Sequence, residues 1–261
     1  MRRITVTIVA AAALAAATLG LSPSSASAHE GPALEKQSWS WQGFFGGYDP
    51  AALKRGFQVY REVCSNCHSL RLLYYRNLSD PGGPGFSVEE VKKIAAEKEV
   101  RDGPNDAGDM FTRFARPSDH FAKPFANDNA ARTANNGALP PDLSLIIKAR
   151  NGGPDYVYNL LMGYKEAPPK MVINPGMQYN TVFPGNQIGM PPPVSEGIVT
   201  YADGTKATQE QVAKDIVSFL NWAAEPELVA RHTLGLKVLG FLFVLTILFY
   251  ALKIQIWKRV H

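Results

Sequence analysis

Apolar residues recur at helical spacing in a first segment that starts near residue 50. Asp49 can cap this helix, and Pro50 suits its first position, where a missing N–H costs no hydrogen bond. Gly56 lies within the segment, and its lack of a side chain would permit close approach of another helix. One predicted buried stripe consists of Leu53, Phe57, Tyr60 and Cys64.

A second amphipathic segment follows Asp203-Gly204. Thr208, with Gln211 three residues later, makes a capping box that predicts a helix start. The apolar stripe of this helix consists of Val212, Ile216, Phe219, Leu220 and Ala223. Between the two helices, residues 101–193 are rich in Gly, Pro and Asn. Their short periodic pieces predict one helical stretch that ends near Arg150.

The N-terminal segment has the pattern of a secretory signal peptide over residues 1–28. Arg2 and Arg3 precede an Ala-rich apolar run without charges, and Ala26-Ser27-Ala28 gives the small residues of a cleavage site. The mature chain is then expected to begin near His29, outside the cytoplasm. The alternative is an anchor helix that is never cleaved.

The C-terminal segment from Leu234 to Ile256 is almost wholly apolar, and its 23 residues suffice to cross a hydrocarbon core of about 30 Å. The side chain of Lys237 can snorkel to the interface. We therefore predict an extracytoplasmic domain over residues 29–230, a transmembrane helix over 231–256 and a cytoplasmic tail over 257–261. A buried core helix is the alternative. The flanking residues Tyr250, Lys253, Trp257, Lys258 and Arg259 suit an aromatic belt and the positive-inside bias.

The distribution of charge along the chain argues against one class of partner. The chain of 261 residues carries 27 Lys and Arg against 23 Asp and Glu. Five of the basic residues lie at the extreme termini, which leaves 22 basic against 23 acidic residues in the central region. A nearly neutral domain argues against a nucleic-acid partner.

The only two cysteines lie in Cys64-Ser65-Asn66-Cys67-His68, the C-x-x-C-H pattern of c-type haem attachment. Two thiols one turn apart can each add to a vinyl group of the porphyrin, and the next residue, His68, can bind the iron. A redox dithiol would require a βαβ context, and a zinc site would require further ligands nearby. One covalent haem c is thus predicted, and two helices that cross over it are the plan of class I cytochromes c.

The sixth iron ligand is expected on a loop shortly before the last helix of the domain. Met190 fits this place, in Gly189-Met190-Pro191-Pro192-Pro193, where the prolines stiffen the strap. Met177 in Pro175-Gly176-Met177 is the second candidate, and an ordinary turn with a spectator Met is the bland alternative. The other residues weighed are Met110, Met162, Met171, His29, His120 and His232.

Haem propionates need hydrogen-bond donors, and Arg150 and Tyr156 are candidates. Composition alone allows both to be ordinary surface residues.

Taken with these motifs, the chain resembles the cytochrome c1 family, from about Trp39 to the end of the membrane span. The resemblance implies that Met190 is the distal ligand and that Asn135, Arg150 and Tyr156 lie around the haem. The fold it implies is mainly α, a class I cytochrome c-like haem domain with long loops plus one C-terminal transmembrane helix. The matching segments are Gly56–His68, Ala134–Ser144 with Lys148–Gly153, Gln187–Pro193, and Asp203–Thr208 through Trp222–Glu227.

The function implied by the resemblance is electron transfer in the quinol–cytochrome c reductase (cytochrome bc1) complex, from the Rieske iron–sulfur protein to a soluble cytochrome c, with cytochrome b as a further partner. The subunit alone is then not an enzyme. The haem domain would face the periplasm, held in membrane lipid by a single span. Two alternatives are a membrane-tethered cytochrome that acts as a free carrier, and a peroxidase-like haem enzyme, which needs an open sixth position.

A soluble cytochrome c usually presents lysines, so an acidic docking surface is expected. The stretch from Glu89 to Asp109 has a local excess of three negative charges. An ordinary solvated helix and loop explain it equally well. The charges are Glu89, Glu90, Glu97, Glu99, Asp102, Asp106 and Asp109 against Lys92, Lys93, Lys98 and Arg101.

Overall fold

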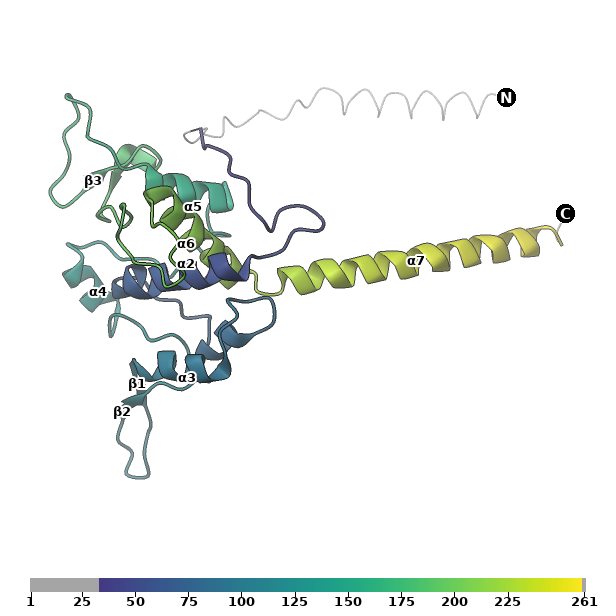
Figure 1. Ribbon diagram of the computed structural model, residues 1–261, viewed down its shortest axis with the longest axis horizontal. Coiled ribbons are helices and arrows are strands. Elements are labelled where there is room, and N and C mark those ends of the chain that lie inside the picture. Colours follow the sequence, from purple (N-terminus) through teal and green to yellow (C-terminus); the bar gives the residue numbers. More distant parts are fainter. Residues whose placement is uncertain (1–32, 260–261) are drawn as a thin grey trace, which may run out of the picture. The chain divides into compact units, whose positions relative to one another are not determined.

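The computed structural model describes residues 33–259. The predicted signal peptide, its cleavage site and His29 lie outside these residues. The chain divides into two units, Met1–Ala33 and Leu34–His261. The helices of the second unit are α2 (Pro50–Glu62), α3 (Val88–Ala96), α4 (Asp128–Ala134), α5 (Gly153–Met162), α6 (Gln209–Ala224) and α7 (Leu228–Trp257), with 3-10 turns η1 (Cys64–Asn66), η2 (Tyr75–Ser79) and η3 (Pro184–Asn186) (Figure 1).

Two short antiparallel hairpins complete the described fold. Strand β1 (Glu99–Asp102) pairs with β2 (Phe111–Phe114), so that Glu99 lies opposite Phe114. Strand β3 (Gln178–Tyr179) pairs with β4 (Gln187–Ile188). The predicted mainly helical fold is confirmed, because the remaining described residues form turns and loops rather than larger sheets.

The first predicted helix is confirmed as α2. The side chain of Asp49 accepts a hydrogen bond from Ala51 N at 3.0 Å, and Pro50 occupies the first turn. The stripe residues Leu53, Phe57 and Tyr60 are buried, as expected. The helix ends at Glu62, so Cys64 begins the turn η1 instead of continuing the helix.

The second predicted helix is confirmed as α6, with one correction at its start. The Thr208 side chain accepts from Gln211 N at 3.2 Å. The return half of the capping box does not form, because the Gln211 amide donates to Asp215 at 3.1 Å. Thr208 N instead donates to Lys206 O at 3.0 Å.

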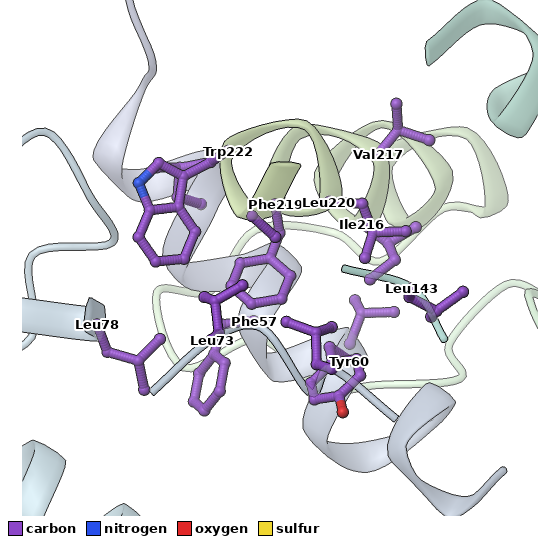
Figure 2. Packing of buried hydrophobic residues seen from close by; sticks show 14 of the residues in the cluster. Phe57, Tyr60, Leu73, Leu78, Leu143, Ile216, Val217, Phe219, Leu220 and Trp222 are labelled. Carbon is purple, nitrogen blue, oxygen red and sulfur yellow. The ribbon is translucent and has the colours of Figure 1, made fainter. Parts of the chain in front are cut away.

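Helices α2 and α6 cross closely at Gly56. A Cβ at this position would overlap the backbone carbonyl of Asp215 and lie 2.6 Å from Phe219 Cβ. The crossing is also tied by Arg55, whose Nε donates to Asp215 at 2.9 Å. Figure 2 shows the core that forms around it, where Phe57 and Tyr60 of α2 face Phe219 of α6.

The expected helical stretch that ends near Arg150 is wrong. Residues 144–148 form a run of turns, and the helix α5 begins only at Gly153. The backbone hydrogen bonds of this run are mainly turn bonds that span three residues, from Ile146 N to Leu143 O at 3.3 Å and from Lys148 N to Leu145 O at 3.0 Å. Asp142, just before this run, accepts from Ser69 Oγ and Arg71 N and so joins the segment to the loop after His68. Gly152, with φ +89°, then supplies the left-handed residue at which α5 begins.

The C-terminal apolar segment forms α7, a helix of 30 residues. Among the described residues it is the one helix long and apolar enough to cross a membrane. Its apolar side chains are exposed, for example Phe243 at 68%, which rules out the buried core helix. The helix starts earlier than the predicted span because Leu228 is buried and belongs to the domain.

Candidate functional site

A cavity of about 590 Å³ opens beside the end of α2, between α5, α6 and the loops that join them. This volume lies within the range of about 300–1,000 Å³ that is typical of ligand pockets. Its walls are mostly apolar, with Ile216 and Leu220 of α6 on one side. All seven residues proposed from the sequence line it: Cys64, Cys67, His68, Asn135, Arg150, Tyr156 and Met190.

The turn after α2 brings Cys64 and Cys67 to the cavity wall. Cys67 N and His68 N both donate to Cys64 O, at 3.1 and 2.9 Å. Ser65 and Asn66 point back to the end of α2, where Ser65 Oγ donates to Arg61 O at 2.8 Å. Neither cysteine forms a disulfide. Burial, with the nearby Cys67, raises the pKa of Cys64 to about 12.

The ring of His68 is oriented by a backbone carbonyl. Its Nδ1 lies 2.8 Å from Pro141 O. Because a carbonyl only accepts, Nδ1 carries the proton, and Nε2 is left with a free lone pair. Burial lowers the pKa of His68 and favours this neutral form. A neutral imidazole with Nδ1–H bonded to a carbonyl is the arrangement of a metal-binding histidine.

Asp142 holds the Pro141 carbonyl in place, and sequence reasoning missed it. Its carboxylate accepts from Ser69 Oγ at 2.7 Å, Arg71 N at 2.9 Å and Ser144 N at 3.0 Å. Burial alone would raise the pKa of Asp142, but these donors outweigh it and lower the pKa. The side chain thus fastens the Pro140-Pro141 segment to the loop that follows His68.

Met190 lies on a different loop, two residues after the end of β4. The Tyr164 hydroxyl donates to Met190 O at 3.1 Å, and Pro191 and Pro193 continue along the cavity wall. Met177 does not line the cavity; its Sδ lies 3.6 Å from the position of a Cβ on Gly189. Of the two candidate thioethers, Met190 is therefore the one placed to reach a bound group.

The loop that carries Met190 is organised by Asn180, a second residue that sequence reasoning missed. Asn180 is fully buried. Its Nδ2 donates to Leu160 O at 2.8 Å, and its Oδ1 accepts from Val182 N at 2.9 Å and Phe183 N at 3.1 Å. One side chain thus joins the end of α5 to the loop that leads to Met190. A lone Asn in a Gly- and Pro-rich segment carries no local signal of this role.

The other three proposed residues are the polar side chains Asn135, Arg150 and Tyr156, which also line the cavity. Asn135 ends α4, and its Nδ2 donates back to Ala131 O at 2.7 Å. Arg150 is exposed, and its guanidinium donates to Ala149 O at 3.0 Å. Tyr156 on α5 is half-buried, and this burial raises the pKa of its phenol, although Arg150 opposes the shift. Arg150 is thus accessible as a donor at the cavity mouth.

The acidic stretch over residues 89–109 lies on α3, β1 and the following loop, and none of its residues lines the cavity. Four of its seven acidic side chains form ion pairs within the chain. The pairs are Glu89–Lys92, Glu90–Lys54, Glu97–Arg61 and Asp102–Arg113. These pairs reduce the local negative field, and a docking role for the stretch stays a prediction.

The donor set of the cavity fits a c-type haem. Two thiols and an imidazole come from one turn, a thioether comes from a separate loop, and the space between has apolar walls. In the described part of the chain, no three His, Cys, Asp or Glu residues form a group that could hold a metal ion. The zinc alternative therefore lacks ligands there.

Comparison with known proteins gives a consistent result. The model of the cytochrome C1 family matches residues 39–260. Cytochrome c1 of Rhodospirillum rubrum is 51% identical over 273 residues, which covers 98% of this chain and 99% of that protein. A cytochrome b/c1 of Bradyrhizobium diazoefficiens is 44% identical, over 99% of this chain and 40% of that longer protein. The mitochondrial heme protein cytochrome c1 1 of Arabidopsis thaliana is 50% identical over 82% of this chain and 69% of that protein.

Proposed function

This chain belongs to the cytochrome c1 family, and from that premise we propose that it carries one haem c, bound covalently through Cys64 and Cys67. Proteins of this family bind haem c and are the haem-carrying electron-transfer subunit of the cytochrome bc1 complex. The observation that supports the attachment is the common cavity onto which both thiols and His68 open.

In this proposal His68 and Met190 would hold the haem iron. The bound group supplies a one-electron redox centre. His68 offers Nε2 because Pro141 O holds the proton on Nδ1. Met190 is presented by a strap that Tyr164 and Asn180 keep in position. Ligation by one methionine and one histidine would raise the reduction potential of the haem relative to ligation by two histidines. The apolar walls of the cavity would exclude water from it.

The proposed roles of Asn135, Arg150 and Tyr156 are to surround the haem. Arg150 and Tyr156 would donate hydrogen bonds to its propionates, since both line the cavity and neither is fully buried. Asn135 would act by packing, because its amide already donates to Ala131 O.

We propose that the subunit takes one electron from a Rieske iron–sulfur protein and passes it to a soluble cytochrome c. No substrate bond is made or broken by the subunit alone. Cytochrome b is the expected neighbour, and the relative named cytochrome b/c1 supports this assignment. Membrane lipid surrounds α7, the haem domain faces the periplasm, and Lys258 and Arg259 remain on the cytoplasmic side.

The test is purification of the full-length chain from membranes through a terminal affinity tag. We expect cytochrome b and a Rieske protein to co-purify, and the preparation to reduce soluble cytochrome c with quinol as donor. A haem-loaded chain that purifies without partners would instead identify a free-standing carrier. Rapid turnover of hydrogen peroxide with an exchangeable sixth ligand would identify a peroxidase-like enzyme.

A further inference from the structure

A short loop before α2, residues 43–47, lies against the first turns of α7. His232 Nδ1 is 3.4 Å from Gly46 O, and a Cβ on Gly47 would lie 3.8 Å from Val229 Cγ2. Just after the loop, the Tyr48 hydroxyl lies 3.3 Å from Asn221 O and 3.2 Å from Glu225 O, at the junction of α6 and α7. The loop is therefore attached at the point where the chain leaves the haem domain and enters the apolar helix.

The tip of this loop presents two phenylalanines to the outside. Phe44 is 52% exposed and Phe45 is 86% exposed, and their rings contact each other edge to face at 5.2 Å. The neighbouring aromatic residues Trp39 and Trp41 are buried and stack on each other. The domain thus buries the two tryptophans of this segment, whereas the two phenylalanines are exposed on its surface.

The backbone of the loop holds this arrangement. Gly46 N donates to Gly43 O at 3.2 Å, and Gly47 N donates to Ser40 O at 3.0 Å. Gly43 has φ +84°, and a Cβ on Gly46 would overlap the backbone of Trp41. Scattered apolar residues on a surface need no explanation. Two adjacent, highly exposed Phe rings on a tightly bonded turn form a defined apolar projection.

The position of the loop along α7 indicates what covers it. The first turns of this helix contain the polar residues Arg231, His232 and Thr233. The apolar segment starts at Leu234, with Lys237 as its one charged residue before Lys253. At 1.5 Å rise per residue, His232 lies about 3 Å along the axis from Leu234. The loop therefore contacts α7 near the point where a membrane-spanning helix would pass from the lipid headgroups into the hydrocarbon core.

We propose that Phe44 and Phe45 insert into the interfacial region of the lipid bilayer, as a second membrane contact beside α7. Aromatic and apolar side chains at this depth bury about 5–10 Å into the boundary between headgroups and acyl chains. With one contact, the haem domain could tilt about its connection to α7. A second contact a short distance away restricts that tilt and so the height of the haem cavity above the membrane. The inference rests on the proposed crossing of α7.

The test uses nitroxide labels on single cysteines in the full-length, haem-loaded chain in phosphatidylcholine vesicles. Phe45→Cys and Phe44→Cys report on the loop, and Leu242→Cys reports on α7. Val172→Cys is the matched control, because Val172 is an apolar side chain about as exposed as Phe45, at 83%, and its carbonyl accepts from Gln187 of β4. The wild-type chain, whose two thiols are occupied by haem, serves as the labelling blank.

We expect the ratio of collision rates with oxygen and with a water-soluble nickel chelate to be several-fold higher at positions 44 and 45 than at 172, and highest at 242. A low ratio at 44 and 45, as for a label in water, together with a high ratio at 242, as for a label in hydrocarbon, would overturn the inference and leave the membrane span intact. A low ratio at 242, as for a label in water, would overturn the membrane span itself. Labels at 44 and 45 that are immobile and shielded from both reagents would show a protein surface there instead of lipid.

Discussion

Replacing Asp142 by asparagine would test whether its hydrogen bonds to the loop after His68, called the clamp below, position His68. The carboxylate accepts three hydrogen bonds, from Ser69 Oγ, Arg71 N and Ser144 N. An asparagine can keep the bond from Ser144 N through its single oxygen. Its NH₂ group would then face Arg71 N–H, donor against donor, whereas the Ser69 hydroxyl can rotate and accept. One bond to a charged group is lost and the others become neutral.

Hydrogen bonds to charged groups contribute about 1.5–3 kcal/mol each, so Asp142→Asn should reduce the free energy of unfolding by about 2–3 kcal/mol. For a domain of this size that corresponds to a fall of about 4–12 °C in the melting temperature. Ser69→Ala removes only one bond and should cost about 1.5 kcal/mol, the lower end of this range. Asp106→Asn is the matched control, because Asp106 is an exposed turn carboxylate that does not line the cavity.

The stabilisation by the Asp142 carboxylate should be lost only as the pH falls. The pKa of Asp142 is lowered in the folded chain, so its stabilisation is present above the ordinary aspartate pKa of about 4. It is lost as pH falls through the lower folded-state pKa. The difference in stability between wild type and Asp142→Asn should be full at pH 7 and vanish in strong acid.

The assay is thermal and denaturant unfolding, followed by the haem absorbance and by circular dichroism, with redox titration beside it. A weaker Pro141 carbonyl contact makes the His68 imidazole a poorer donor, so the reduction potential should rise. Equal stability of wild type and Asp142→Asn at pH 7, with an unchanged potential, would refute the role of the clamp.

Three further predictions concern the haem site and the helix crossing. Cys64→Ala with Cys67→Ala should abolish haem staining on a denaturing gel, and haem that stays on the gel would contradict thioether attachment. Met190→Leu should lower the potential by well over about 60 mV, a tenfold change for one electron, and should let carbon monoxide bind, while Met177→Leu should do neither. Gly56→Ala should cost about 3 kcal/mol, because its Cβ overlaps α6, measured by unfolding.

Gly47→Ala is the matched control for Gly56→Ala. A Cβ on Gly47 meets only Val229 Cγ2 at 3.8 Å, an ordinary contact, so the change should stay within about 0.5 kcal/mol. Similar losses for both glycines would mean that the close crossing of α2 and α6 is not the cause.

The sequence predicts what depends on local pattern. Helices α2 and α6 follow from apolar stripes with a cap residue at each start, and α7 follows from length and composition. The five-residue pattern that ends at His68 identifies a haem attachment site because both thiols and the imidazole are adjacent along the chain. These features require no knowledge of tertiary contacts.

What the sequence does not reveal depends on contacts between distant residues. Turns over residues 144–148 stand where a helix was expected, and Asp142 just before them bonds to Ser69 and Arg71, some 70 positions earlier. Asn180 joins the end of α5 to the Met190 strap through its buried amide. Neither residue differs in pattern from an ordinary turn residue, so only the tertiary structure shows its role.

The two loops that carry the proposed ligands are held by different chemistry. On the His68 side the loop is held by the carboxylate of Asp142, whose negative charge strengthens its three hydrogen bonds. On the Met190 side it is held by the amide of Asn180 and the phenol of Tyr164, and burial raises the pKa of Tyr164. Neither of these neutral groups titrates as pH falls from 7. Acid should therefore release the Pro141 carbonyl from its position while the Met190 strap keeps its hydrogen bonds, so the histidine side of the cavity is the part of the site that responds to pH.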